Sequence, residues 1–198
     1  MVRLRVSAGL PLALGLLALG RAGEAPKPHI LMFLADDFGH YDISYNNPDA
    51  PTPTLHQLAS DGVILNRHYV YQYCSPTRSS FMSGRLPIHV NTANHPTTVL
   101  GGVDLRMQTV AEALKSAGYA CHTAGKWHAG AHLWSQLPTQ RGFDSQLGYL
   151  NGMEDHYTQV FDQLSGVDLW LNNAPAVGMN GMLPSLPGAW LSMISGEG

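Results

Sequence analysis

The sequence is short of the features that most directly assign a protein to a functional class. Charged residues make up 13% of its 198 residues and form no basic run, which excludes binding of nucleic acid through a general positive field. Cysteine occurs only at Cys74 and Cys121, so the chain can form at most one internal disulfide. The Asn-x-Ser/Thr pattern that accepts N-linked glycans does not occur at all.

Long apolar runs are also missing, except near the N-terminus. Arg3 and Arg5 precede a mostly apolar or small stretch at residues 6–20. Pro11 interrupts this stretch, which is short for a bilayer crossing, so we expect no stable membrane span. The pattern predicts a secretory signal peptide at residues 1–22, with an uncleaved signal anchor as the alternative. Export implies an oxidising compartment, in which one disulfide between the two cysteines is the simplest state.

Hydrophobic periodicity and turn residues predict alternating strands and helices. Continuous apolar runs are typical of buried strands, and an N-cap residue before apolar residues at helical spacing indicates a helix. We expect strands at residues 29–35, 63–70 and 119–124, and helices at residues 53–62, 74–84 and 109–118. This order predicts an α/β fold with a largely parallel sheet flanked by helices.

The pattern weakens after residue 157. Residues 167–171 are compatible with a further strand. The chain from Asn172 onward is rich in Gly, Pro, Met and Asn and has no clear period. We therefore expect residues 161–198 to form a divergent or poorly ordered tail, in which the chain from Asn172 onward either belongs to no folded element or reflects a truncated or spliced product.

The segment at residues 74–85, CSPTRSSFMSGR, has the pattern of a helix with a nucleophile at its start. Pro76 suits the first helical turn, and Gly84 suits the position just past the helix end. Arg78 lies one turn from Cys74 on the same helical face. Free N–H groups at a helix N-terminus attract anions, and a guanidinium adds to that attraction. The segment predicts a nucleophile beside an anion site; the alternative is an ordinary buried cysteine.

Two further polar motifs follow predicted strands. Asp36 and Asp37 are adjacent carboxylates, which favour binding of a hard cation such as calcium or magnesium. Lys126 and His128 are spaced to share one face of an extended stretch, where they suit anion binding and proton transfer. Ligands of open α/β sheets sit beyond the carboxyl ends of strands, so we expect both motifs and Cys74 at one sheet edge. The alternatives are a turn-capping Asp pair and a surface turn.

Together these segments resemble the formylglycine-dependent sulfatase family. Residues 74–85 match its signature, Cys-x-Pro-Ser/Thr-Arg followed by a small-residue stretch that ends in Ser/Thr-Gly-Arg. Residues 33–39 (FLADDFG) resemble its opening strand, and residues 125–130 (GKWHAG) resemble its Gly-Lys-Trp-His-x-Gly motif. Ala129 stands where a larger apolar residue is usual. The resemblance implies an alkaline-phosphatase-like fold, here truncated.

The resemblance also implies a modified nucleophile and a metal ion. In this family a formylglycine-generating enzyme converts the residue corresponding to Cys74 into formylglycine, whose hydrated aldehyde attacks a sulfate ester. Asp36, Asp37 and the group formed from Cys74 are then the ligands of one Ca²⁺ per site. This reading excludes a disulfide between Cys74 and Cys121, since Cys74 is no longer a thiol.

The remaining catalytic roles follow from the same resemblance. Arg78 is expected to steady the hydrated formylglycine. Lys126 is expected to contact the sulfate, and His128 a hydroxyl of the formylglycine. The implied catalytic residues are therefore Cys74, Arg78, Lys126 and His128.

Residues 141–144 (RGFD) and 148–157 (GYLNGMEDHY) look like the segment that follows this motif in arylsulfatase B and its relatives. We expect them to be packing and pocket-wall elements rather than catalytic ones. Tyr149 or His156 is the candidate for lining a substrate cleft.

The resemblance covers residues 28–160, the first part of a sulfatase. The second half of family members supplies an Asp-Asn pair that completes the metal site, and no convincing Asp-Asn pair follows residue 157. The expected organisation is a signal peptide at residues 1–22, the N-terminal part of a sulfatase catalytic domain at residues 23–160, and the tail at residues 161–198.

The sequence therefore predicts a sulfuric ester hydrolase, arylsulfatase-like and either extracellular or lysosomal. Its substrate is expected to be a sulfate-ester small molecule or a sulfated glycan. One alternative is a catalytically inactive truncated isoform or gene-model fragment that lacks the C-terminal metal ligands. A phosphatase or phosphonate hydrolase is a second alternative, which the cysteine at position 74 disfavours because those enzymes usually keep Ser or Thr there.

Overall fold

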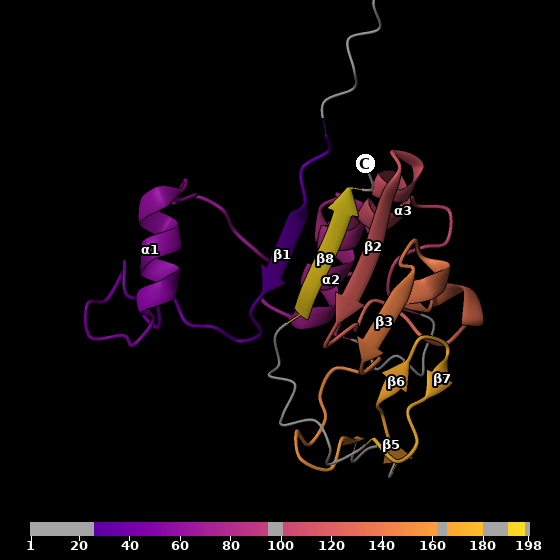
Figure 1. Ribbon diagram of the computed structural model, residues 1–198. Helices are drawn as coiled ribbons and strands as arrows, with labels where there is room; N and C mark the ends of the chain where they lie inside the picture. Colours follow the sequence, from indigo (N-terminus) through magenta and orange to yellow (C-terminus); the bar gives the residue numbers. More distant parts are fainter. Residues whose placement is uncertain (1–25, 95–100, 162–165, 180–189, 197–198) are drawn as a thin grey trace, which may run out of the picture.

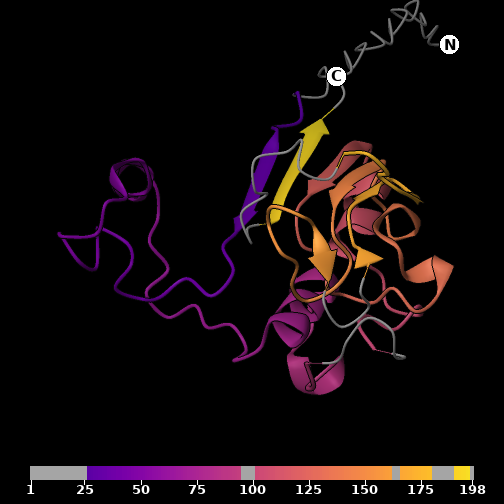
Figure 2. The ribbon, with the colours of Figure 1, turned by 90° about the horizontal axis from the view of Figure 1, so that it is seen from below.

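The computed structural model describes residues 26–94, 101–161, 166–179 and 190–196. The signal peptide expected at residues 1–22 lies outside these residues. A six-stranded sheet forms the body of the protein, and two helices lie behind its central strands in Figure 1. Figure 2 shows the same arrangement from below, with a third helix standing apart from the body.

The sheet is mixed. Its strands, in spatial order, are β1 (Ile30–Leu34), β8 (Trp190–Gly196), β2 (Tyr119–Ala124), β3 (Ser145–Gly148), β6 (Trp170–Leu171) and β7 (Ala174–Pro175). Within the described chain, only β2 and β3 pair in parallel, whereas β8 is antiparallel to both of its neighbours. A separate antiparallel pair joins β4 (Val160–Phe161) and β5 (Gly166–Val167). The α/β class is confirmed, but the expectation of a largely parallel sheet is wrong.

The predictions for three strands and for the C-terminal stretch have different outcomes. The strands expected at residues 29–35 and 119–124 are confirmed as β1 and β2. The strand expected at residues 63–70 is wrong: this segment has no regular structure, and the Val63 side chain is 85% exposed. The expectation of no folded element after Asn172 is also wrong, because β7 and β8 lie there.

Strand pairing explains both corrections. The backbone of β8 pairs with β1 on one side and with β2 on the other, so Met193 is in register with Leu31 and with His122. A strand needs neighbours that take up its backbone N–H and C=O groups, and the 63–70 segment has none among the described strands. The strand expected at residues 167–171 is divided between β5 and β6, with buried Asp168 and Leu169 between them.

The three predicted helices all form. They are α1 (Pro53–Asp61), α2 (Cys74–Ser83) and α3 (Val110–Ser116). Helix α3 begins with a capping box, in which Thr109 and Glu112 satisfy each other's backbone N–H groups. Helix α2 ends at Gly84, whose φ of 64° is the left-handed conformation that favours glycine. Helix α1 buries none of its residues and projects away from the sheet (Figure 1).

Three short 3₁₀ turns complete the described helical structure. They are Pro87–His89 after α2, and Trp134–Gln136 and Pro138–Gln140 between β2 and β3. Each of the first and third begins with proline, whose fixed φ suits a first helical position.

The core lies between the sheet and the two packed helices. It is formed by buried apolar side chains from α2, α3, β2 and the loops that follow: Met82, Val103, Ala111, Cys121, Trp127, Ala129, Leu137, Phe143 and Leu150. The Cys121 side chain is fully buried and Cys74 is partly accessible, and both thiols are free. The disulfide between them, the simplest reading of the composition, is therefore not formed.

The chain after β2 is fixed by continuing its pairing with the chain after β3. The N–H groups of Trp127 and His128 donate to the carbonyl oxygens of Tyr149 and Leu150 over 2.9 and 3.1 Å. The backbones approach so closely that a Cβ atom at Gly148 would lie 2.1 Å from the carbonyl oxygen of Gly125. Glycine at position 148 is thus a requirement of the segment that carries Lys126 and His128.

We expect Gly148→Ala to lower the free energy of unfolding by about 2–4 kcal/mol, because the new methyl group forces two backbones apart. Gly178→Ala is the matched control. Gly178 also has a positive φ, 82°, but a Cβ atom there meets nothing within 4 Å, so we expect a loss of about 1 kcal/mol. Urea denaturation measures both. Equal losses would contradict the close approach at Gly148.

Candidate active site

An open pocket of about 330 Å³ lies where β1 and β2 end and α2 begins. Five of the residues singled out in the sequence line it: Asp36, Asp37, Cys74, Lys126 and His128. They come from three separate parts of the chain, and the sheet topology brings them to one edge. Tyr149 and His156, the two candidates for a cleft wall, also line this pocket.

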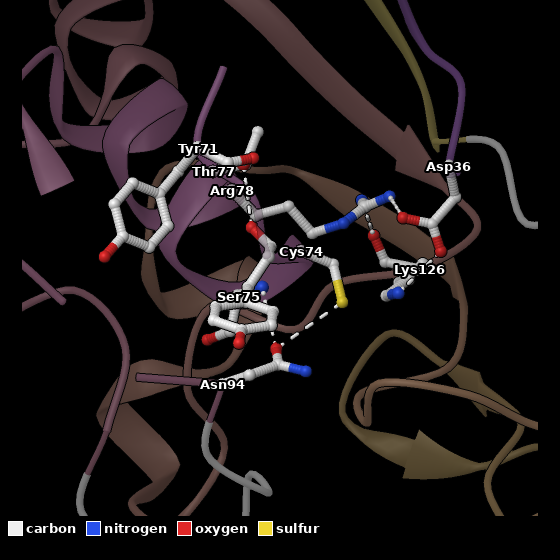
Figure 3. A network of polar contacts seen from close by, with 9 residues as sticks. Asp36, Tyr71, Cys74, Ser75, Thr77, Arg78, Asn94 and Lys126 are labelled. Atoms are coloured by element: carbon white, nitrogen blue, oxygen red, sulfur yellow. Dashed lines mark hydrogen bonds and ion pairs between the residues drawn. The ribbon is translucent and has the colours of Figure 1, made fainter. Parts of the chain in front are cut away.

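A buried cluster of three charges organises the pocket floor. The Asp36 carboxylate accepts from Lys126 Nζ over 2.6 Å and from an Arg78 guanidinium N–H over 3.3 Å (Figure 3). Arg78 also donates to the backbone carbonyl of Lys126 over 2.7 Å. The Lys126 and Arg78 side chains are only 2% and 4% exposed. One carboxylate between two buried cations leaves the cluster with a net positive charge, which suits an anionic ligand.

Cys74 stands at the first position of α2, with its thiol toward the pocket (Figure 3). The side chain of Asn94, from a distant loop, lies across this helix end. Its carbonyl oxygen is 3.5 Å from Cys74 Sγ and accepts from the backbone N–H of Ser75 over 3.2 Å. The Thr77 hydroxyl is bound to the carbonyl oxygens of Tyr71 and Tyr73, over 2.9 and 2.8 Å. These contacts fix the turn that presents Cys74.

Two of the pocket residues have a left-handed backbone. Asp37 has φ of 49° and His128 has φ of 48°, a conformation uncommon outside glycine. His128 is 3% exposed, and a Cβ atom at Gly152 would lie 2.7 Å from its ring. Backbone held in this way costs about 1–3 kcal/mol per residue and needs support from its surroundings. Of the four described residues other than glycine with a positive φ, these two are ones for which the sequence predicts a role; Gln159 and Asn172 are the other two.

A second part of the pocket lining is formed by the chain after β3. Gly152, Met153, Glu154 and His156 line it there. Glu154 is 9% exposed, and burial, then the charges of Asp168 and Asp155, raises its pKa to about 8. Burial likewise raises the pKa of the Tyr149 phenol, and the nearby Asp36 carboxylate adds to this.

Asp168 anchors this wall. Its buried carboxylate accepts from the backbone N–H groups of Leu150 and Asn151 over 3.3 and 2.8 Å. The Asn151 side-chain amide and the Trp170 indole N–H add two further bonds of 2.8 Å each. Burial raises the pKa of Asp168 against the opposing effect of these bonds.

The residues present fit one side of a metal site. Asp36 and Asp37 offer carboxylate oxygens at the pocket, beside Cys74. Calcium takes six to eight oxygen ligands, and Asp36 is already bound by two cations. Within residues 26–94, 101–161, 166–179 and 190–196, no group of three or more His, Cys, Asp or Glu side chains is arranged to hold a metal ion. The two aspartates are thus a partial ligand set.

Two pocket residues, Asn94 and Glu154, were not singled out from the sequence. Asn94 lies in a long loop without motif or period, and only the fold brings it to the start of α2. Glu154 lies within the segment expected to form a pocket wall, but its type alone does not separate it from neighbouring Asp155, which is exposed. A carboxylate two residues after Gly152, in the segment that follows a strand, is a weak sequence signal.

The chain matches a known protein family. The model of the Sulfatase family matches residues 28–169. Arylsulfatase J of Mus musculus is 39% identical over 163 residues, which are 79% of this chain and 27% of that protein. N-acetylgalactosamine-6-sulfatase of Homo sapiens is 35% identical over 144 residues, 67% of this chain and 27% of that protein. The chain therefore spans about a quarter of the length of the curated relatives it matches.

Solved structures give the same result for the fold. The crystal structure of Ps i-CgsB in complex with k-i-k-neocarrahexaose superposes with a TM-score of 0.64 at 25% identity, covering 72% of this chain and 36% of that one. The PsFucS1 sulfatase from Pseudoalteromonas sp. gives a TM-score of 0.50 at 29% identity, covering 64% and 26%. The alkaline-phosphatase-like class is confirmed. The family model matches well over half of the residues of this chain, which therefore belongs to the sulfatase family.

Proposed function

We propose that the chain carries the first part of the active site of an arylsulfatase-like sulfuric ester hydrolase. The observation that supports this most is the pocket at the start of α2, where Cys74 lies beside buried, charged Lys126 and beside His128. A nucleophile position next to a cationic floor and a helix N-terminus suits attack on an anionic ester. The substrate is a sulfate-ester small molecule or a sulfated glycan.

The proposed nucleophile is formylglycine made from Cys74 by a formylglycine-generating enzyme. This group supplies a hydrated aldehyde, whose oxygen is the attacking atom in covalent catalysis. Cys74 is suited to the modification because its thiol is free and partly accessible, whereas the other cysteine is fully buried. Asn94 and the start of α2 hold this position in the pocket.

The other roles fall to residues around this position. Lys126 presents a cation to the sulfate while Asp36 balances its charge. Arg78 binds the Asp36 carboxylate and the Lys126 carbonyl, and its proposed role is to position both and to steady the hydrated formylglycine. The proposed role of His128, whose backbone N–H donates to the carbonyl oxygen of Leu150, is to hold or accept a proton at the hydroxyl of the group at position 74.

Asp36 and Asp37 are the proposed ligands of one Ca²⁺, together with the oxygen of the group formed from Cys74. Calcium supplies positive charge next to the sulfate oxygens when it is bound. Three ligands are fewer than the six to eight oxygens that calcium takes, so further oxygens are needed to complete the site. This incomplete ligand set favours a second candidate, a sulfatase-family chain that does not turn over substrate by itself.

We further propose that the chain enters the secretory pathway and acts outside the cell or in the lysosome. Its predicted signal peptide and its sulfatase family membership support this. No helix within the part of the chain that the structure describes is long and apolar enough to cross a bilayer.

Turnover tests the proposal directly. We expect the chain, co-expressed with a formylglycine-generating enzyme and supplied with Ca²⁺, to hydrolyse 4-nitrophenyl sulfate in preference to 4-nitrophenyl phosphate. Cys74→Ala removes the nucleophile and is expected to abolish turnover, whereas Cys121→Ala is the matched control and is expected to retain it. Mass spectrometry of the peptide around position 74 is expected to show sulfur replaced by oxygen with loss of two hydrogens.

Each outcome of this experiment has one meaning. Preference for the phosphate ester, or turnover by a chain whose Cys74 is still a thiol, contradicts the proposed chemistry. A fully converted Cys74 without any turnover supports the second candidate, a chain that does not turn over substrate by itself.

Inorganic sulfate tests the anion site without any modification. We expect Lys126→Met to weaken sulfate binding at least tenfold, because a bond to a charged group contributes about 1.5–3 kcal/mol. Lys115→Met is the control: it removes the same charge from an exposed pair with Asp144, so binding is expected to be unchanged. Isothermal titration calorimetry measures both affinities. Equal weakening would mean that only net charge matters.

A further inference from the structure

Glu154 is a buried carboxyl group whose oxygen atoms are not used by any hydrogen bond within the part of the chain that the structure describes. It is 9% exposed, and neither carboxyl oxygen has a hydrogen-bond partner within the described chain. It lines the same pocket as Cys74 and Lys126. We propose that Glu154 is a specificity-determining residue, which hydrogen-bonds a hydroxyl group on the alcohol part of the sulfate ester. This inference rests on the proposed function of the pocket.

The position of Glu154 in the pocket determines which part of a substrate it meets. Cys74 and Lys126 belong to the floor formed at the ends of β1 and β2 and the start of α2. Glu154 belongs to the part of the lining that the chain after β3 forms. A sulfate group bound at Cys74 occupies the floor, so the alcohol to which it is attached meets the rest of the lining. Glu154 is therefore assigned to the leaving group rather than to the sulfate.

Comparison with its acidic neighbours separates Glu154 from a structural carboxylate. The Asp168 oxygens accept four hydrogen bonds, and Asp155 accepts from the backbone of Tyr157 and Thr158 and from the Thr158 hydroxyl. Both of these side chains are used to hold the wall together. Of these three carboxyl groups, only that of Glu154 has two oxygen atoms without a hydrogen-bond partner among the described residues. A buried polar group without a partner costs free energy of folding.

The charge state of Glu154 is compatible with an anionic substrate. Burial is the main reason that its pKa rises to about 8, and the charges of Asp168 and Asp155 add to the effect. At neutral pH the group is mostly a neutral carboxylic acid, which does not repel a sulfate. A neutral carboxyl group can donate through its O–H and accept through its C=O. Both match a hydroxyl group, which also donates and accepts.

The chemistry predicts a preference among sulfate esters. A sulfated sugar has hydroxyl groups next to the ester that satisfy Glu154. Phenyl sulfate has no such hydroxyl group. When it binds, it shields the Glu154 carboxyl group from water without offering it a hydrogen-bond partner. The pocket is thus expected to prefer polyhydroxylated alcohols to plain aromatic ones.

Binding, measured without turnover, tests this assignment. Every chain carries Cys74→Ser and is produced without a formylglycine-generating enzyme, so that the ester stays intact. Calorimetry compares galactose 6-sulfate with phenyl sulfate. We expect Glu154→Ala to weaken binding of galactose 6-sulfate about tenfold and to leave phenyl sulfate unchanged. Glu154→Gln keeps a donor and an acceptor at the same place and is expected to retain most of the sugar affinity.

The outcomes separate the two proposals. Equal effects of Glu154→Ala on both esters, or no effect on the sugar ester, overturn the role of Glu154 while the sulfate site stands. If the chain without a change at Glu154 binds neither ester nor inorganic sulfate, the proposed function itself fails, and this inference fails with it. Circular dichroism of each variant confirms that the fold is kept.

Stability as a function of pH gives a second, independent readout. The pKa of Glu154 is about 8 in the folded chain against an ordinary value of 4.5, so the folded state holds a proton that the unfolded state has lost between these values. The stabilisation of the folded state by this proton is complete below about pH 4.5 and is lost as the pH rises through about 8. We expect Glu154→Gln to reduce the fall in urea midpoint between pH 5 and pH 8. If the urea midpoint falls equally with and without Glu154→Gln, Glu154 is solvated and charged in the folded chain, which overturns the inference.

Discussion

The buried ion cluster of Asp36, Lys126 and Arg78 is the interaction on which the rest of the site depends. It joins the end of β1, the segment after β2 and helix α2, which are far apart in the sequence. Two cations buried this deeply are tolerated only because a carboxylate and a backbone carbonyl receive their hydrogens. The same contacts that place the elements therefore also keep positive charge at the pocket floor.

This arrangement explains why the surrounding backbone is so restricted. Lys126 can reach Asp36 only if the chain after β2 stays close to the chain after β3, which requires glycine at position 148. The left-handed turns at Asp37 and His128 direct both side chains into the same pocket. The cost of that strain is offset by the ladder of backbone bonds and by the cluster itself. A protein selected for stability alone has little reason to hold a lysine in this way.

Local pattern predicted the parts of this structure that local forces determine. The capping box at Thr109, the glycine at position 84 and the bounds of β2 all follow from a few neighbouring residues. Long-range pairing decided the rest. The sequence of residues 190–196 does not indicate that they form a strand between β1 and β2. The sequence around Asn94 does not indicate that its side chain accepts a hydrogen bond from the start of α2. The shared sheet edge was predictable because strand ends in α/β folds have a common place for ligands.

The pocket has two walls that are held by different means, and this division has a consequence for function. The floor is a composite of three elements tied by one ion cluster, so a change in any of them disturbs the others. The wall formed by the chain after β3 is anchored by Asp168 through Asn151 and Trp170, and its backbone also pairs with the segment that carries Lys126 and His128. The Glu154 side chain takes part in neither set of contacts, so it can be replaced without breaking a contact that the floor requires. In the proposed function, sulfate binding by the floor is thereby kept separate from the choice of the alcohol to which the sulfate is attached.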